Sequence, residues 1–121
     1  MANVKLFTLH ALAATTAAET AVGDWIDVDG FNELYLALNV TIFASVAGSE
    51  TLTVTIERQN PTTTGYVTIA TFTQITTTGA HDEEKLVASF IGGRIRARMI
   101  TAGTWSSKSI TFEVKGYAKL A

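Results

Sequence analysis

Apolar and polar residues alternate along most of this chain, in short runs separated by segments rich in threonine and glycine. The clearest run extends from Phe31 to Phe43. One of its faces carries Leu34, Leu36, Leu38, Val40 and Ile42, and the other carries Tyr35, Ala37, Asn39 and Thr41. A repeat of two residues is typical of a β-strand with one buried face. The pattern therefore predicts a protein built from strands.

Runs of the same kind predict about eight strands in the whole chain. They extend over Val4–Leu9, Trp25–Val28, Phe31–Phe43, Thr51–Glu57, Tyr66–Ile75, Leu86–Phe90, Arg94–Thr101 and Ile110–Lys115. Short strands at regular spacing are typical of a β-sandwich or a β-barrel. The sandwich is favoured because the apolar faces are wide and aliphatic, and no ring of inward polar groups marks a ligand cavity. We therefore expect an all-β fold, a single-domain, jelly-roll-like sandwich with antiparallel strands.

The connecting segments are predicted from their turn residues. Asn60–Gly65 contains Pro, which fixes φ, and Gly, which permits positive φ, so a hairpin is expected there. The next segment, Tyr66–Ile75, has apolar residues on both faces, which indicates either a bulge or a strand between two packed surfaces. The polar stretch Thr76–Glu84 is predicted to be a surface loop.

The N-terminal part has a different composition from the rest of the chain. Ala11–Ala21 is rich in alanine, which favours helix, but its threonines favour strand, so both interpretations remain open. We divide the chain into an N-terminal arm or edge strand, residues 1–21, and a β-sandwich domain, residues 22–121. An arm of small residues is suited to lying across another subunit or along an edge of its own sheet.

Composition limits the classes of partner. The chain has 121 residues, with nine basic and eleven acidic side chains, so its formal charge of −2 predicts no binding to nucleic acid or to an anionic membrane. No run approaches the ~20 apolar residues of a membrane span. Cysteine is absent, which excludes disulfides and thiolate metal sites.

Two acidic clusters resemble metal sites superficially. Three aspartates lie between Asp24 and Gly30, as in a calcium loop. If Gly30 took the sixth position of such a loop, Trp25 and Leu36 would take the first and twelfth, and neither can ligate. His81–Glu84 offers an imidazole and three carboxylates, but consecutive loop residues seldom converge on one point. We expect a solvated turn and a charged surface loop, with no metal and no cofactor.

Catalytic chemistry has little support in the sequence. The only histidines, His10 and His81, have no local companions that indicate a triad with Ser or Thr. The tryptophans, Trp25 and Trp105, are of the residue type that stacks on sugar rings, but core or rim packing is the favoured interpretation of each. We expect a protein that is bound by partners and is not an enzyme.

Three arginines form the most specific charged feature of the chain. Arg94, Arg96 and Arg98 alternate along one predicted strand, so their guanidinium groups lie on one face, ~13 Å from end to end. They are predicted either to pair across the sheet with Glu57 or Glu113, or to contact a neighbouring subunit. Binding of phosphate or nucleic acid is a third interpretation, and it is disfavoured because no aromatic residue is interleaved with them.

Several strand blocks carry a resemblance to a known class of proteins. The blocks are Leu36-Ala37-Leu38-Asn39-Val40-Thr41, Leu52-Thr53-Val54-Thr55-Ile56-Glu57, Ala70-Thr71-Phe72-Thr73-Gln74-Ile75-Thr76, Gly93-Arg94-Ile95-Arg96-Ala97 and Ser109-Ile110-Thr111-Phe112-Glu113-Val114-Lys115-Gly116. In order and type they look like small β-rich structural proteins from the head and tail regions of tailed bacteriophages, over about three quarters of the chain. The resemblance implies a virion component, often a capsid decoration (cement) protein or a tail-associated sandwich, without enzymatic activity or cofactor. It assigns no functional residue.

These observations together define the expected function. The leading hypothesis is a capsid decoration protein that binds the major capsid protein on the virion surface, as a symmetric oligomer for which a trimer is favoured. A tail or head-fibre component is the alternative within the same class. A carbohydrate-binding module is the alternative from another class, and an enzyme is the least supported.

Overall fold

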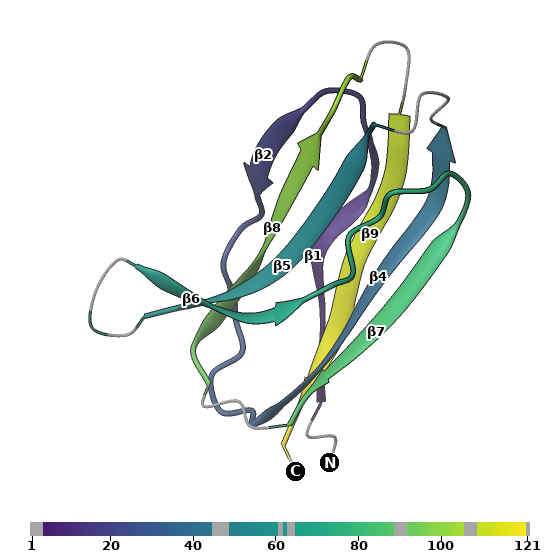
Figure 1. Cartoon of the computed structure of the whole chain (residues 1–121). Helices are drawn as coiled ribbons and strands as arrows, with labels where there is room; N and C mark the ends of the chain where they lie inside the picture. Colours follow the sequence, from purple (N-terminus) through teal and green to yellow (C-terminus); the bar gives the residue numbers. More distant parts are fainter. Residues whose placement is uncertain are drawn as a thin grey trace.

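A computed structural model describes residues 4–44, 49–60, 62, 65–88, 92–105 and 109–120. Within these ranges the chain forms strands and no helix (Figure 1). The strands are β1 (Val4–Thr15), β2 (Glu19–Val22), β3 (Ile26–Asp27), β4 (Glu33–Ala44), β5 (Thr51–Gln59), β6 (Tyr66–Thr71), β7 (His81–Val87), β8 (Arg94–Ala102) and β9 (Ser109–Lys119). A helix that would cross a bilayer is therefore not found in the described part. The prediction of an all-β protein is confirmed.

The strands form two antiparallel sheets that lie against each other (Figure 1). Sheet A has the strand order β1-β9-β4-β7, and sheet B has the order β2-β8-β5-β6, with β3 also paired to β8. The pairs β1·β9, β2·β8, β4·β7 and β5·β6 are nested like one long hairpin, and the pairs β4·β9 and β5·β8 roll that hairpin into two layers. This connectivity is that of a jelly roll, as predicted.

The core lies between the sheets and is built from alternate residues of the strands. Leu34, Leu36 and Val40 of β4 have no exposed surface, and Leu52 and Ile56 of β5 are equally buried. Most of the remaining buried apolar side chains come from β1, β8, β9 and the segment after β6. The full set of these remaining side chains is Phe7, Leu9, Val28, Leu38, Phe43, Val54, Phe72, Ile75, Ile95, Ala97, Met99, Trp105, Ile110, Phe112, Val114 and Ala118. Removing this apolar surface from water is the main stabilising contribution available to the chain.

One prediction for β4 is wrong. The pairing of β4 with β9 shifts register between Val40 and Ile42, so a bulge lies at Thr41. An extra residue reverses the facing of everything after it. Ile42 is 58% exposed and Phe43 only 3%, so Phe43 continues the buried face to which the alternation assigned Ile42.

The structure also decides the conformation of two further segments, Ala11–Ala21 and His81–Glu84. Ala11–Ala21 contains no helix, because β1 extends to Thr15 and residues 19–22 form β2. These two strands are the edges of sheets A and B, and the division of the chain at residue 21 stays a prediction. The four residues His81–Glu84 were expected in a loop but begin β7, which pairs with β4. Charged side chains are compatible with this position because β7 is an edge strand.

The expected hairpin and bulge are both present. β5 and β6 pair directly, and the Asn60 amide donates to the Gly65 carbonyl across the turn, at 2.9 Å. The register between these strands shifts after Ile56, where Ile69 of β6 has no partner opposite it. The predicted strand Leu86–Phe90 is described only as far as Ala88, and it is the C-terminal part of β7 that ends at Val87.

Candidate functional site

The arginine row lies on the outer face of sheet B. Arg94, Arg96 and Arg98 alternate with buried residues of β8, so all three side chains point away from the core. Glu57 of β5 is the register partner of Arg96. Arg96 Nε donates to Glu57 Oε1 at 2.9 Å, and Arg98 Nε donates to Glu57 Oε2 at 2.6 Å. One carboxylate therefore holds two arginines side by side.

Two aromatic rings complete this cluster. Trp25, just before β3, lies under the Arg96 guanidinium, whose carbon is 4.2 Å from the ring centroid. Tyr66, the first residue of β6, lies 5.4 Å from the same atom of Arg96 and 4.8 Å from that of Arg98. No aromatic residue is interleaved with the arginines along β8 itself, but the fold brings these two rings from elsewhere in the chain to the guanidinium groups. We call Trp25, Glu57, Tyr66, Arg96 and Arg98 the arginine cluster.

The arginine cluster buries the carboxylate of Glu57 on the outer face of sheet B. The Glu57 side chain is 1% exposed although it lies on the outer face, because the arginines and aromatics cover it. A buried carboxylate is tolerated only when it is paired. The hydrogen bond to Glu57 raises the pKa of Arg98, against the opposing effect of burial. Within the arginine cluster, two guanidinium groups and one carboxylate leave one excess positive charge.

The arginines thus divide into two groups. Arg96 and Arg98 pair within the chain with Glu57, which is one of the two partners expected from the sequence, Glu57 and Glu113. Arg94 is exposed at the start of β8. Their contact with a neighbouring subunit stays a prediction.

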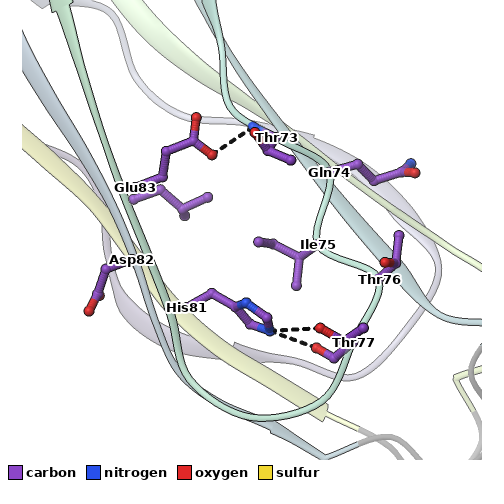
Figure 2. Close-up of a pocket in the computed structure, with 9 residues that line it drawn as sticks. Thr73, Gln74, Ile75, Thr76, Thr77, His81, Asp82 and Glu83 are labelled. Carbon is purple, nitrogen blue, oxygen red and sulfur yellow. Dashed lines mark hydrogen bonds between the residues drawn. The ribbon is translucent and has the colours of Figure 1, made fainter.

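The polar cluster around His81 forms a pocket of about 300 Å³ between β7 and the segment that follows β6 (Figure 2). His81 Nε2 donates to the Thr77 carbonyl at 2.7 Å, and Glu83 Oε1 accepts from the Thr73 amide at 2.8 Å. Figure 2 shows both side chains directed at that segment and Asp82 pointing away from it. These groups hold the segment against β7, and they do not converge on one point as a metal or acid/base site requires.

The pKa of Glu83 reflects this role. Partial burial acts to raise it, but hydrogen bonds from Thr73 and from Lys85 outweigh burial, so the pKa is lowered. The carboxylate is therefore an acceptor that stays ionised, which suits a fixed structural bond and does not suit a general acid.

The second histidine lies on the opposite edge of sheet A. His10 of β1 stacks on Phe112, with ring centroids 4.2 Å apart, and its Nδ1 lies 3.2 Å from the Phe112 carbonyl. Burial lowers the pKa of His10, and the backbone hydrogen bond opposes that effect only partly. Because β1 and β7 are the two edges of the sheet, His10 and His81 do not share a site.

The remaining candidates are explained by local structure. Asp27 Oδ1 accepts from the Asp29 amide at 2.9 Å, which closes the turn expected between Asp24 and Gly30. In the ranges that the structure describes, no three histidine or acidic side chains are grouped so that they would hold a metal ion.

The tryptophans differ in their surroundings. Trp105 is 6% exposed, stacks on Phe43 with centroids 5.9 Å apart, and donates from Nε1 to the Ala102 carbonyl at 2.9 Å. Trp25 is half-buried beneath Arg96. Trp105 therefore belongs to the core, and Trp25 presents a ring that is already covered by a guanidinium.

Comparison with known proteins gives similarity at the level of structure alone. No protein-family model and no curated protein sequence matches the chain. Among solved structures, the infectious bursal disease virus VP2 subviral particle aligns with a TM-score of 0.62 and 13% identity. A structure of the Gx strain of the same virus aligns with a TM-score of 0.61 and 12% identity. What is shared is the fold.

The coverage of these matches is uneven. The chain aligns over 97% of its own length but spans only 32% of the VP2 chain. A Clostridium thermocellum xylanase 10B fragment with CBM22-1 and GH10 modules, complexed with xylohexaose, aligns with a TM-score of 0.51 and 10% identity. The chain spans 26% of that fragment. The same sandwich therefore occurs in proteins of unrelated function, as is general for jelly rolls.

Proposed function

We propose that this chain is a non-enzymatic structural protein of a virion, and more specifically a bacteriophage capsid decoration protein that binds the major capsid protein and stabilises the assembled shell. The observation that supports the proposal most is the jelly roll itself, which aligns over 97% of the chain with VP2 of a subviral particle. The resemblance of its strand blocks to phage head and tail proteins points in the same direction.

The surfaces of the molecule suit a binding role. Both sheets are held rigid by a shared core, and four edge strands, β1, β7, β2 and β6, border them. Edge strands and sheet faces are the elements through which β-proteins meet partners. Binding sites that exist only in the assembled shell would stabilise that shell by mass action. A homo-oligomer, with a trimer favoured, would present several copies of each contact.

The absence of catalysis is part of the proposal. Each histidine is in contact with a backbone carbonyl, of Phe112 for His10 and of Thr77 for His81. Glu57 and Glu83 accept hydrogen bonds from neighbours in the chain. Groups engaged in this way support the fold and are poorly placed to exchange protons with a substrate.

Shell binding is the direct test. Purified protein is mixed with phage shells from which decoration proteins have been stripped, and the mixture is sedimented and then heated. Saturable co-sedimentation with shells, and a higher temperature of shell disruption, are expected. Binding to isolated tails or head fibres in place of shells would favour the alternative virion component. A protein that binds neither shells nor tails contradicts both versions.

A carbohydrate-binding module is the second candidate. It is supported by the alignment with the xylanase fragment that carries CBM22-1. Trp105 cannot serve as its sugar platform because it lies in the core, so Trp25 is the remaining tryptophan. Glycan-array binding that Trp25→Ala abolishes, in a protein indifferent to shells, would select this candidate.

A further inference from the structure

The arginine cluster leaves guanidinium nitrogens available to a partner. Within the part of the chain that the structure describes, Arg96 binds Glu57 through Nε alone, and Arg98 binds it through Nε and Nη2. In the same ranges, neither arginine has a nitrogen that is both buried and without a hydrogen-bond partner. Both terminal nitrogens of Arg96 and the Nη1 atom of Arg98 therefore reach the surface with N–H groups that donate to nothing in these ranges.

The charge that remains in the arginine cluster is positive. Glu57 neutralises one of the two guanidinium groups. Arg94, the next arginine on this face, has Asp27 as its register partner on β3, so these two charges balance each other. A site with one excess positive charge thus lies on a chain whose formal charge is −2. An anion is attracted to this place although the whole molecule is acidic.

The two guanidinium groups are held in position before a partner arrives. Trp25 lies against Arg96, Tyr66 lies against Arg98, and the buried carboxylate of Glu57 bonds both. An arginine on an open surface loses rotamer freedom when it binds, and fixing it beforehand reduces that cost. Tryptophan, tyrosine and arginine are also the residue types enriched at the energetic centres of protein interfaces. The composition of the arginine cluster is therefore typical of a protein-binding site.

The surface beside the arginine cluster is uncharged. Val22 of β2 and Thr55 of β5 are the register partners of Arg98, and Ile100 follows it on the same face of β8. Val22 and Ile100 are both partly accessible to solvent. Nucleic acid presents a series of phosphates and requires several cations to bind it. One excess charge next to aliphatic and hydroxyl groups suits a carboxylate of a protein segment better.

We propose that the outer face of sheet B binds an acidic segment of a partner protein, with an aspartate or glutamate carboxylate accepting from the terminal nitrogens of Arg96 and Arg98. A carboxylate accepts two parallel N–H donors, which is the arrangement that a guanidinium offers. Uncharged side chains of the same segment would lie over Val22 and Ile100. This inference deepens the proposed function, on which it rests, by assigning the contact surface and the chemistry of its partner.

The first test is an NMR titration of the isotope-labelled full chain with a peptide of alternating glutamate and threonine. Saturable shifts are expected for the Trp25 indole and for the Nε signals of Arg96 and Arg98, and added salt should weaken the binding. The indole of Trp105 lies in the core and is the internal control, which should not shift. This measurement needs no variant, so it does not depend on whether a substituted chain folds.

Variants test the two arginines one at a time. Arg96→Gln and Arg98→Gln each remove one set of charged donors and are expected to weaken peptide binding about tenfold. Lys115→Gln is the matched control, because it removes the same charge from an exposed position on β9 of sheet A. Its peptide binding should equal that of wild type. Circular dichroism checks that each variant is folded.

Several outcomes would overturn the proposal. These are a wild type without saturable shifts, shifts confined to sheet A, equal binding of a glutamine–threonine peptide, tighter binding of oligothymidylate than of the acidic peptide, and arginine variants that bind like Lys115→Gln. Binding to shells is measured in parallel. Wild type that binds shells but not the acidic peptide contradicts this surface alone, whereas wild type that binds the peptide but neither shells nor tails contradicts the proposed function alone.

Discussion

Glu57 on β5 and Arg96 on β8 lie directly opposite each other on the outside of sheet B, and the Arg96 Nε to Glu57 Oε1 distance is 2.9 Å. The carboxylate also binds Arg98, and its side chain is 1% exposed. A charge on an outer face is thus buried by its own partners. The pairing joins two central strands of the sheet and so contributes to the rigidity of the scaffold.

Replacing Glu57 by Gln is expected to destabilise the protein by about 2 kcal/mol or more, because two partly buried guanidinium groups lose their counter-charge and repel each other. The free energy of unfolding from urea denaturation measures this. Glu113→Gln is the matched control, since Glu113 pairs with the exposed Lys115, and its effect should be smaller. Equal losses of unfolding free energy for the two variants would show that the arginine cluster stabilises the fold no more than an exposed ion pair does.

The bulge in β4 predicts opposite outcomes for two adjacent residues. Phe43→Ala should cost about 3–5 kcal/mol because it empties a core position beside Trp105. Ile42→Thr should change stability by no more than about 0.5 kcal/mol because its side chain is exposed. Thermal and urea unfolding of the two variants measure the difference. The uninterrupted alternation of the sequence predicts the reverse order, so the experiment decides between the two registers.

Gly116 is required by the close approach of β9 to β4. A Cβ at this position would lie 1.9 Å from the Tyr35 carbonyl oxygen, which is backbone that cannot turn aside. Gly116→Ala is therefore expected to destabilise the fold by about 2–3 kcal/mol. Lys115→Ala, one residue earlier and exposed, should stay within about 0.5 kcal/mol of wild type. A silent Gly116→Ala in a thermal melt would mean that the strands are further apart than described.

His10 makes stability depend on pH. Burial lowers its pKa from the ordinary 6.5 in the folded chain, so the unfolded chain binds the proton more readily. Its contribution to stability is complete above pH 6.5 and is lost as the pH falls through that value toward the lower folded pKa. The unfolding midpoint in urea, measured from pH 8 to pH 5, should fall more steeply for wild type than for His10→Gln. Parallel curves for the two proteins would contradict the burial of His10.

How much the sequence predicts depends on how local the cause is. The alternation of Leu34 to Val40 identifies β4 because strand periodicity is a property of neighbouring residues. The turn residues of Asn60–Gly65 identify the hairpin for the same reason. The loop expected at His81–Glu84 was wrong because its charged residues resemble a loop until β4 supplies a partner strand.

The candidate sites were predictable only in part. The spacing of Arg94, Arg96 and Arg98 was sufficient to place them on one face, and Glu57 was among the partners expected from opposite charge. Nothing in the sequence indicated that Trp25 and Tyr66 would contact the arginines. Both residues are distant from the arginines in sequence, and the pairing of β3 with β8 and of β6 with β5 brings them close.

By itself the sequence determined the class of this protein: an all-β sandwich whose strands can be read from the alternation of side chains, with no disulfide to support them. Only the tertiary structure decided where Ile42 and Phe43 point and which aromatics cover Glu57. The physical reason is that periodicity acts within a strand, whereas register acts between strands that are distant in sequence. A shift of one residue moves a side chain to the opposite face without altering the local pattern.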